Sequence, residues 1–431
     1  MSVASTLPAG AASSSRQTPV RVVLAGFGTV GRSVAALLTQ PGDEVSLVAV
    51  VDRRAALKQE GWDGAGVRWT ESLDEALDAG ADVFVELIGG LNPAEQWIRA
   101  ALERGISVVT ANKQVIAHAG PALFALAASR GCQLRFEGAV AGGVPVIRAI
   151  ESGLAGDTLT EVAGILNGTC NYILTRMEQD GADFGDALKE AQKLGYAEAD
   201  PSMDVNGGDA RAKLAILAMV ALGVQAPAHA ILAEPITDVS PIDFQYARRL
   251  GCTIRQISRA SRDEAGTLTA AVGPALVPFA SALARVNGSE NLVKVKGRFG
   301  GETSFGGRGA GGDPTAVAVV SDVLAIARGV RPAGVRTAVE VDRVSSDASV
   351  PYYVRFTVRD RPGIIAALAT VFAKHAINID AILQEQGFPD SARPFMVSLD
   401  EAPSQTVRAA LTEITAFDFH VAPPLAMPVL A

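Results

Sequence analysis

A glycine-rich turn between a short apolar segment and an amphipathic segment is the feature that most restricts the fold of this chain. Residues 20–38 read VRVVLAGFGTVGRSVAALL, with glycines at Gly26, Gly28 and Gly31. In a GxGxxG turn the glycines allow a pyrophosphate to approach the N-terminus of the next helix, where free N–H groups and the helix dipole favour an anion. A second apolar segment, EVSLVAVVD, ends at Asp52, where a ribose-binding acid is expected. The sequence therefore predicts a dinucleotide-binding domain.

The residues after the second strand leave the choice between NAD and NADP open. A carboxylate at Asp52 would accept hydrogen bonds from the ribose hydroxyls of NAD and would repel a 2′-phosphate. Arg53 and Arg54 follow at once and could hold that phosphate.

Further strand and helix units complete a doubly wound parallel sheet of Rossmann-like α/β type, which we assign to residues 19–148. Its expected segments are the strands ADVFVELIGG, ISVVTANK and CQLRFEG and the helices 93–104 and 121–130. Because ligands bind beyond the carboxyl ends of such strands, the turns 87–90 and 110–113 should face the cofactor.

The chain of 431 residues is long enough for two or three domains, and its 43 glycines and 5% aromatic residues favour an α/β architecture. A net charge of -8 without a run of Lys and Arg argues against nucleic acid as a partner. No apolar segment approaches the roughly 20 residues of a membrane-spanning helix. Residues 1–18 lack the pattern of a secretion signal and are expected to form a disordered tail.

Cysteine and histidine usage indicates a reducing compartment without a transition metal. Cys132, Cys170 and Cys252 form no CxxC pair, which is typical of free thiols in a cytoplasmic protein. The four histidines have none of the spacings that bind zinc.

The stretch 195–213, GYAEADPSMDVNGGDARAK, holds the candidate chemistry. Glu198, Asp200 and Asp204 are expected on a loop, before a helix that opens near Asp209 and places that residue on one face with Lys213. An ordinary Asp to Lys pair at a helix N-terminus is one interpretation. The other is a substrate site, in which carboxylates hold an ammonium group and the lysine supplies a proton to an oxygen.

This stretch belongs to an α+β domain that we assign to residues 149–310. The segment TLTEVAGILNGTCNYIL predicts a strand, a turn at Asn167 and Gly168, and a helix, and TIRQISRA, GTLTAAVG and NLVKVKG predict antiparallel strands. Residues 311–345 should form a helix and linker, with Asp313 as N-cap and Pro314 at the first helical position. This helix is either a plain linker or a return to the first domain that closes the cleft.

A small C-terminal unit is expected over residues 350–425 with the order βαββαβ. The strand around 354–358 gives way at Asp360 to a helix with Pro362 near its start, and a strand with Asn378 follows. The segment 393–400, a helix over 404–415 and a strand over 417–421 complete it.

Seven motifs resemble those of homoserine dehydrogenases that carry a C-terminal ACT domain. In order along the chain they are GFGTVG, ELIGG, VTANK, EGAVAGGVP, GILNGTCNYIL, LGYAEADPSMDVNGGDARAK and GRGAGGDPTA. The resemblance implies interconversion of L-aspartate 4-semialdehyde and L-homoserine with NADP or NAD, in threonine, methionine and isoleucine biosynthesis. It implies a monofunctional enzyme, since no kinase domain precedes the dinucleotide domain.

The resemblance also assigns roles to single residues. Lys213 would transfer the proton beside the carboxylate of Asp209, Glu198 and Asp204 would hold the amino group and hydroxyl of the substrate, and Lys113 would be a second lysine between cofactor and substrate. The cofactor contacts implied in addition to Gly26, Gly31, Asp52 and Arg53 are Phe27, Gly28, Thr29, Val30, Thr110, Gly195 and Gly311.

Three further features come only from the resemblance. A structural sodium ion would be held by Glu137 and the carbonyls of Val140, Gly142 and Val144. L-Threonine would bind as effector through Asp360, Gly363 and Asn378. Pairing of ACT domains would make the protein a homodimer or homotetramer. The chain departs from the family at Cys170, where threonine is usual.

Two rival functions are consistent with parts of the sequence. A semialdehyde dehydrogenase that forms an acyl phosphate needs a thiolate nucleophile, and none of the three cysteines lies in a convincing setting for one. A non-catalytic amino-acid sensor would use the dinucleotide fold and the ACT unit for binding only, but the presence of both Lys213 and Lys113 argues against it.

Overall fold

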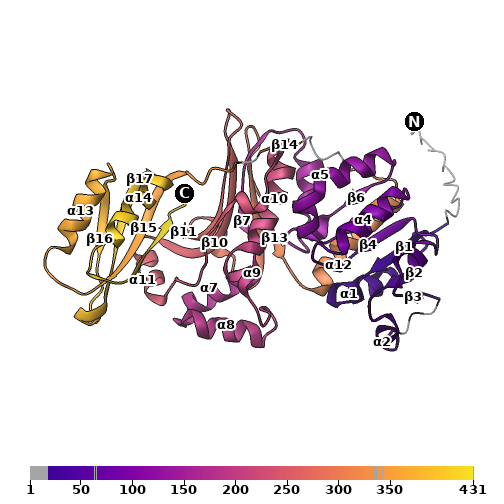
Figure 1. Ribbon diagram of the computed structural model, residues 1–431, viewed down its shortest axis with the longest axis horizontal. Helices are drawn as coiled ribbons and strands as arrows, with labels where there is room; N and C mark the ends of the chain where they lie inside the picture. Colours follow the sequence, from indigo (N-terminus) through magenta and orange to yellow (C-terminus); the bar gives the residue numbers. More distant parts are fainter. Residues whose placement is uncertain (1–17, 63, 65, 333–337, 342, 431) are drawn as a thin grey trace, which may run out of the picture.

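The computed structural model describes residues 18–62, 64, 66–332, 338–341 and 343–430. The predicted tail lies outside this range except for Thr18, and so do residues 333–337 and 342 of the predicted linker. Figure 1 shows three parts in a row: a parallel sheet flanked by helices, a central sheet with its own helices, and a C-terminal unit at the opposite end.

The first part is the predicted doubly wound sheet, in the order β3-β2-β1-β4-β5-β6 with all neighbours parallel. Its inner strands are runs of Val and Ala because helices cover both faces. The strands are β1 (Val20–Ala25), β2 (Val45–Val51), β3 (Arg68–Thr70), β4 (Val83–Glu86), β5 (Ser107–Thr110) and β6 (Leu134–Arg135). The helices are α1 (Thr29–Leu38), α2 (Ala55–Gln59), α3 (Leu73–Leu77), α4 (Ala94–Glu103) and α5 (Lys113–Ser129).

Helix α5 begins eight residues earlier than the predicted start at Pro121. Asn112 caps it, because its side chain accepts hydrogen bonds from the N–H groups of Gln114 and Val115. Pro121 lies inside the helix, where it removes only its own N–H donor, and the buried residues on either side of it keep the segment helical. The earlier start matters for function because it places Lys113 in the first turn.

A short irregular connection leads into the central part through η1 (Glu137–Ala139), α6 (Val146–Arg148) and η2 (Ala149–Gly153). The central sheet has the order β13-β12-β7-β10-β11-β9 and is antiparallel except for β9 beside β11. Its strands are β7 (Leu159–Ile165), β9 (Leu232–Ala233), β10 (Cys252–Arg262), β11 (Leu268–Pro278), β12 (Glu290–Gly297) and β13 (Gly301–Arg308). The predicted α+β substrate domain is therefore present, and its sheet has two strands, β9 and β13, that the sequence pattern did not predict.

The helices of this part are α7 (Gly168–Asp180), α8 (Phe184–Lys193), α9 (Ser202–Val205), α10 (Gly208–Leu222) and α11 (Pro241–Arg249), with the short turns η3 (Ala228–Ala230) and η4 (Ala282–Arg285). A separate two-stranded pairing joins β8 (Val224–Gln225) to β14 (Val339–Glu340). Helix α10 is buried on nearly all sides, since it lies between the central sheet and α5 of the first part. It carries Asp209 and Lys213 into the junction of the two parts.

Helix α12 (Gly312–Ala327) returns to the first domain and packs along α1, so it is not a plain linker, whereas the closing of a cleft by this helix stays a prediction. Its N-cap is Gly311 and not Asp313, because the chain enters the helix with φ at +118°, a conformation that glycine tolerates. Asp313 lies in the first turn instead and accepts a hydrogen bond from Ser33 Oγ of α1 at 2.8 Å. Helix α12 thus connects the second domain to α1, the helix that follows the glycine-rich turn.

The C-terminal unit has the predicted βαββαβ order, folded into a sheet of order β16-β17-β15-β18. Its elements are β15 (Ser349–Val358), α13 (Ile364–Lys374), β16 (Ile379–Leu383), η5 (Asp390–Ala392), β17 (Arg393–Pro403), α14 (Ser404–Thr415) and β18 (His420–Pro428). Helix α13 starts after Asp360 and Pro362, because Gly363 has φ at +97° and interrupts the helical path. The last strand is later and longer than predicted, and its prolines are tolerated because β18 is an edge strand.

This unit is not an isolated domain, because it shares a core with the substrate domain. Tyr353, Met396 and Met427 pack in one hydrophobic cluster with residues of α7 and α11. Asp243 of α11 is fully buried and accepts hydrogen bonds from Tyr353 Oη at 2.6 Å and Arg355 Nε at 2.7 Å. A movement of the C-terminal sheet would therefore also displace side chains of α7 and α11.

Candidate active site at the junction of the two domains

The candidate catalytic residues meet at the N-terminus of α10. Gly207, with φ at +76°, turns the chain into the helix, and Asp209 occupies its first turn. Asp209 Oδ2 lies 2.7 Å from Lys213 Nζ, one turn further along the same helix. Asp209 Oδ1 lies 2.8 Å from Lys113 Nζ, which comes from α5 of the dinucleotide domain. One buried carboxylate therefore bridges two lysines from different domains.

The two lysines decide the ionisation of this carboxylate. Burial alone would raise the pKa of Asp209, but the neighbouring ammonium groups of Lys213 and Lys113 hold it well below its usual range. Burial would likewise lower the pKa of Lys113. The negative charge of Asp209 outweighs this effect of burial, so the pKa of Lys113 is raised. Lys213 is only 13% exposed and also donates to the carbonyl of Leu166 at 2.8 Å. The site thus holds charged groups that are kept out of bulk water.

Asn167 organises the carboxylates and was not singled out as a functional residue from the sequence. Its amide nitrogen donates to Asp209 Oδ2 at 2.8 Å and to Asp204 Oδ1 at 2.7 Å. Its amide oxygen accepts from Cys170 N and caps α7. The strand-turn-helix pattern of GILNGTCNY was the available signal, since Asn at such a turn is a helix N-cap whose remaining amide donors point outward.

Asp204 and Glu198 lie near this pair in different settings. Asp204 is on the short helix α9 and not on a loop as predicted, because Pro201 starts a single helical turn. Burial raises the pKa of Asp204. Glu198 is exposed on the loop after α8, and both carboxylates act electrostatically on Lys113. Asp200 points elsewhere and accepts from Ser202 Oγ at 2.5 Å. The structure therefore brings together Lys213, Asp209, Lys113, Asp204 and Glu198, and leaves Asp200 out.

The glycine-rich turn has the shape that a dinucleotide requires. Gly26 has φ at +91°, and a Cβ there would lie 2.7 Å from the carbonyl oxygen of Leu87. A Cβ at Gly31 would lie 2.1 Å from the carbonyl oxygen of Gly26. Gly28 is the N-cap of α1 and makes no side-chain capping bond, so the first N–H groups of the helix remain available for an anion. The following residues Thr29 and Val30 form the first turn of α1.

A cavity of about 430 Å³ opens beside this turn. Its lining includes the glycine-rich turn, the end of β2 and the α2 residue Lys58. Lys58 Nζ lies 2.5 Å from Asp52 Oδ2, and the same oxygen accepts from Phe27 N at 2.8 Å. Burial works to raise the pKa of Asp52, but these contacts lower it. Lys58 was missed in the sequence because its partner lies six residues away, outside the glycine motif.

The remaining cofactor candidates differ in where they lie and in how exposed they are. Thr110 is fully buried at the end of β5, and its hydroxyl donates to Glu86 Oε2 at 2.6 Å, so the side chain supports the turn and does not face a ligand. Arg53 is exposed at the mouth of the 430 Å³ cavity. Gly195 is exposed after α8, with φ at +77°. Gly311 lies close to α1, because a Cβ on the next residue, Gly312, would lie 2.9 Å from Ser33 Oγ.

The predicted sodium loop forms a buried irregular turn in front of α6. Glu137 is 3% exposed, and its two carboxylate oxygens accept from the N–H groups of Ile147 at 2.8 Å and Arg148 at 2.9 Å. Burial raises its pKa to about 7. Gly142 has φ at +47°, and the carbonyl of Val144 accepts from Val146 N. Buried carboxylate and carbonyl oxygens are the donors that a hard cation prefers, and Glu137 already acts as a helix cap.

The proposed effector residues are held by separate neighbours. Asp360 Oδ2 lies 2.6 Å from Arg393 Nη1, while Asn378 donates to Asp400 Oδ2 at 2.6 Å. Gly363 is the N-cap of α13.

The cysteines lack the features of a nucleophile. Burial raises the pKa of Cys170 well above its ordinary value, and burial also raises the pKa of Cys132 and of Cys252. Within the described ranges, no three side chains of His, Cys, Asp or Glu gather as metal ligands, and no helix is both long and apolar enough to cross a membrane.

Family profiles match three successive segments of the chain. The profile of the homoserine dehydrogenase NAD binding domain matches residues 26–137, the homoserine dehydrogenase profile matches residues 145–324, and the ACT domain profile matches residues 352–416. Together they cover the dinucleotide turn, the site around Asp209 and the C-terminal unit.

Curated relatives and solved structures agree with these profiles. Homoserine dehydrogenase of Mycobacterium tuberculosis (strain H37Rv) is 40% identical over 424 residues, covering 92% of this chain and 93% of the relative. That of Pseudomonas aeruginosa is 36% identical, covering 93% and 96%. The crystal structure of a homoserine dehydrogenase from Thiobacillus denitrificans superposes with a TM-score of 0.86 at 33% identity, covering 96% and 98%. A hyperthermophilic archaeal homoserine dehydrogenase in complex with NADPH gives 0.63 at 26% identity, covering 73% and 100%. The chain belongs to the homoserine dehydrogenase family of NAD(P)-dependent oxidoreductases.

Proposed function

We propose that this enzyme interconverts L-aspartate 4-semialdehyde and L-homoserine, and thereby serves threonine, methionine and isoleucine biosynthesis. The observation that carries the proposal is the bridge from Lys113 through Asp209 to Lys213, which joins the dinucleotide domain to the substrate domain at one point. A substrate held there would lie between the cofactor-binding turn and a buried proton donor.

Each charged group has a place in the reaction. When bound, the nicotinamide supplies the hydride that reaches the aldehyde carbon. The ammonium group of Lys213 gives its proton to the oxygen of that carbon, and in the reverse direction the neutral amine takes it back. Asp204 and Glu198 attract the α-ammonium group of the substrate, while Asp209 keeps the two lysines apart and fixed.

The test is an absorbance assay of nicotinamide reduction with L-homoserine. We expect reduction of coenzyme without added phosphate, because the reaction needs no acyl acceptor. A requirement for phosphate with the semialdehyde would indicate an acyl-phosphate dehydrogenase instead. Binding of coenzyme without any turnover would indicate a sensor.

We propose that both NADP and NAD are used. Asp52 is engaged by Lys58 and by the N–H of Phe27, so its charge is partly neutralised where a 2′-phosphate would lie. Arg53 and Arg54 line the same cavity and add positive charge.

We propose a structural sodium ion at the loop formed by Glu137, Val140, Gly142 and Val144. The ion would join this loop to the start of α6 and hold the connection between the two domains. Thermal unfolding in sodium chloride should occur at a higher temperature than in N-methyl-D-glucamine chloride of equal ionic strength. Glu137→Gln should reduce that difference, and an equal melting temperature in both salts would argue against the ion.

We propose that L-threonine regulates the enzyme through Asp360, Gly363 and Asn378 and that the ACT domains pair in a homodimer or homotetramer. The shared core with α7 supports coupling, because Asn167 at the N-terminus of α7 holds the active-site carboxylates. Coupling free energies of allosteric enzymes are typically about 1 to 3 kcal/mol.

Removing the unit would expose this core, so point variants are the better test. Threonine inhibition should be lost in Asn378→Ala and retained in Gln40→Ala, which alters an exposed amide side chain of the dinucleotide domain.

A further inference from the structure

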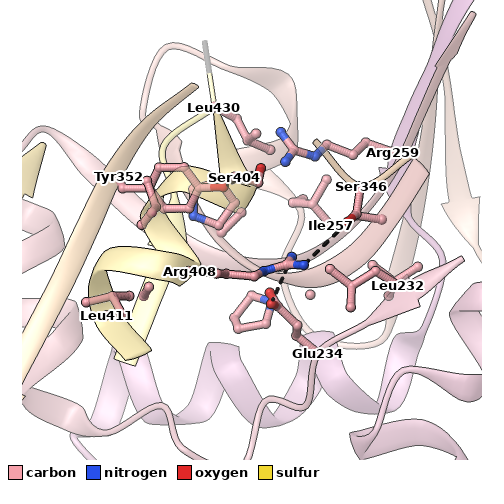
Figure 2. A pocket seen from close by; sticks show the side chains of 18 residues that line it. Leu232, Glu234, Ile257, Arg259, Ser346, Tyr352, Ser404, Arg408, Leu411 and Leu430 are labelled. Atoms are coloured by element: carbon pink, nitrogen blue, oxygen red, sulfur yellow. Dashed lines mark hydrogen bonds and ion pairs between the residues drawn. The ribbon is translucent and has the colours of Figure 1, made fainter. Parts of the chain in front are cut away.

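A small cavity lies at the seam between the substrate domain and the C-terminal unit, and neither catalytic lysine lines it (Figure 2). Strands β9, β10 and β11 form one side, and α14 and β18 form the other. Its volume is about 60 Å³. Since one water needs about 10–15 Å³ of such volume, the cavity has room for roughly four to six waters or an organic molecule of similar size.

Arg259 is a charged side chain that lines this cavity and has no role in the site described above. It points into the hollow from β10, and burial lowers its pKa despite the electrostatic influence of Glu234 and Glu161. Among the described residues no hydrogen bond or ion pair reaches its guanidinium group. A second hollow of about 190 Å³ adjoins the same side chain. Arg259 is half-buried, so its guanidinium is only partly hydrated, and an anion that entered the cavity would compensate for the lost hydration.

Glu234 is the second ionisable side chain in this cavity without a close hydrogen-bond partner, and its charge is opposite to that of Arg259. The distance between Glu234 Oε1 and Arg408 Nη2 is 3.6 Å, which is too long for a good hydrogen bond, and Arg408 also points to Ser346 Oγ at 3.4 Å. Partial burial raises the pKa of Glu234, although 41% of its side chain is exposed. Figure 2 shows Glu234 and Arg408 on the opposite side of the hollow from Arg259. The carboxylate therefore has room for a further cationic donor.

Most of the remaining wall is apolar. Leu232, Ile257, Leu411 and Leu430 surround the charged groups. Ser404, which also lines the cavity, is already engaged, because it accepts a hydrogen bond from Tyr352 Oη at 2.7 Å and donates to the carbonyl of Ala348 at 2.8 Å. A molecule that suits the site thus carries one anionic and one cationic group and a short apolar part.

We propose that this seam binds a small α-amino acid, with Arg259 holding its carboxylate, Glu234 holding its ammonium group and the leucine and isoleucine side chains covering its side chain. The site is distinct from the one proposed at Asp360 and Asn378. Its occupant would contact β11 and α14 at once and so would strengthen the docking of the C-terminal unit on the substrate domain.

The test is calorimetric titration of the full-length protein with L-alanine and L-threonine as probes, together with propionate and ethylamine. Propionate is alanine without the ammonium group, and ethylamine is alanine without the carboxylate. We expect at least one amino acid to bind and both analogues to bind at least tenfold more weakly. Arg259→Leu and Glu234→Gln should each weaken amino-acid binding at least tenfold.

Two control variants separate this site from others. Because L-threonine is also the effector proposed at Asn378, the controls use L-alanine. Asn378→Ala, at the other proposed effector site, and Arg285→Leu, which removes an exposed cation of the same domain, should leave alanine binding unchanged. Without ligand, Arg259→Leu should melt at the same or a higher temperature, because it removes a half-buried cation that no described residue pairs with. Arg259→Lys keeps the charge and should retain part of the binding, so a folding defect in the leucine variant would not obscure the result.

Three results would overturn the proposal. The first is that neither amino acid binds, or that binding is lost in Asn378→Ala and kept in Arg259→Leu. The second is that propionate binds as tightly as alanine, because Glu234 would then have no role. The third is that Arg259→Leu changes the sedimentation behaviour of the protein, because Arg259 would then pair with another copy of the chain.

Discussion

Lys113 Nζ lies 2.8 Å from Asp209 Oδ1, although the two residues belong to different domains. The lysine is in the first turn of α5 beside the dinucleotide-binding sheet, and the aspartate is in the first turn of α10 in the substrate domain. This ion pair therefore exists only when the two domains are docked. It sets the position of the second lysine as well, since Lys213 binds the other oxygen of the same carboxylate.

Loss of the proton donor should abolish most of the turnover. We expect Lys213→Ala to lower kcat at least a hundredfold, because positioned proton transfer contributes roughly a hundredfold to ten-thousandfold, and to leave coenzyme affinity nearly unchanged. The measurement is steady-state kinetics with homoserine. Lys189→Ala, which removes an exposed lysine of α8, should behave like the unmodified enzyme. Near-normal turnover of the Lys213 variant would contradict the assignment.

The amide of Asn167 should matter for both catalysis and stability. Asn167→Ala removes two hydrogen bonds to carboxylates and the cap of α7. Hydrogen bonds to charged groups contribute about 1.5 to 3 kcal/mol, so kcat/KM should fall about tenfold to a hundredfold. The lost cap should cost about 1 kcal/mol of unfolding free energy.

Ser72→Ala is the matched control, because it removes the cap of α3 away from the site. It should show the loss of stability without the loss of activity. If both variants had equal kcat/KM, Asn167 would be a cap only.

Coenzyme preference should respond to the pair between Asp52 and Lys58. Asp52→Ala frees Lys58 and removes a negative charge, so the ratio of kcat/KM for NADP to that for NAD should rise about tenfold or more. Lys58→Ala and Arg53→Ala should shift the ratio the other way. Parallel kinetics with the two coenzymes measure it, and an unchanged ratio in all three variants would show that other residues read the ribose.

A half-buried acid beside the domain connection, Glu151, should make stability depend on pH. Burial raises the pKa of Glu151 to about 7, above the value of about 4.3 for an unperturbed glutamate. A raised folded-state pKa gives stability that is fully present below about pH 4 and is lost as the pH rises through about 7. Glu151→Gln should therefore unfold less readily than the unmodified protein at pH 8, by on the order of 1 to 3 kcal/mol, and similarly at pH 4.

Denaturant unfolding at several pH values tests this expectation. Glu103→Gln, at an exposed position of α4, should shift nothing. A difference between the Glu151 variant and the unmodified protein that stays constant from pH 4 to pH 8 would show that ionisation is not its origin.

The local parts of this protein follow from its sequence. Strand β1, which ends at Ala25, the glycine-rich turn and helix α1 are specified by neighbouring residues, because apolar periodicity and glycine conformations act over a few positions. The same holds for the pair of Asp209 and Lys213, which one helical turn brings together. The predicted helix starts were wrong where a single backbone angle or capping side chain determined the first residue of the helix, as at Gly311, Gly363 and Asn112.

Contacts between segments distant in the chain required the tertiary structure. Nothing near Lys113 indicates that its ammonium group reaches Asp209, because the contact depends on how two domains dock around α10. The same reason applies to the contact of Lys58 with Asp52, to the two roles of Asn167 and to the position of Arg259 beside the seam cavity. Sequence patterns report which residues share one element, whereas charge pairing and desolvation depend on which elements pack together, and only the fold decides that.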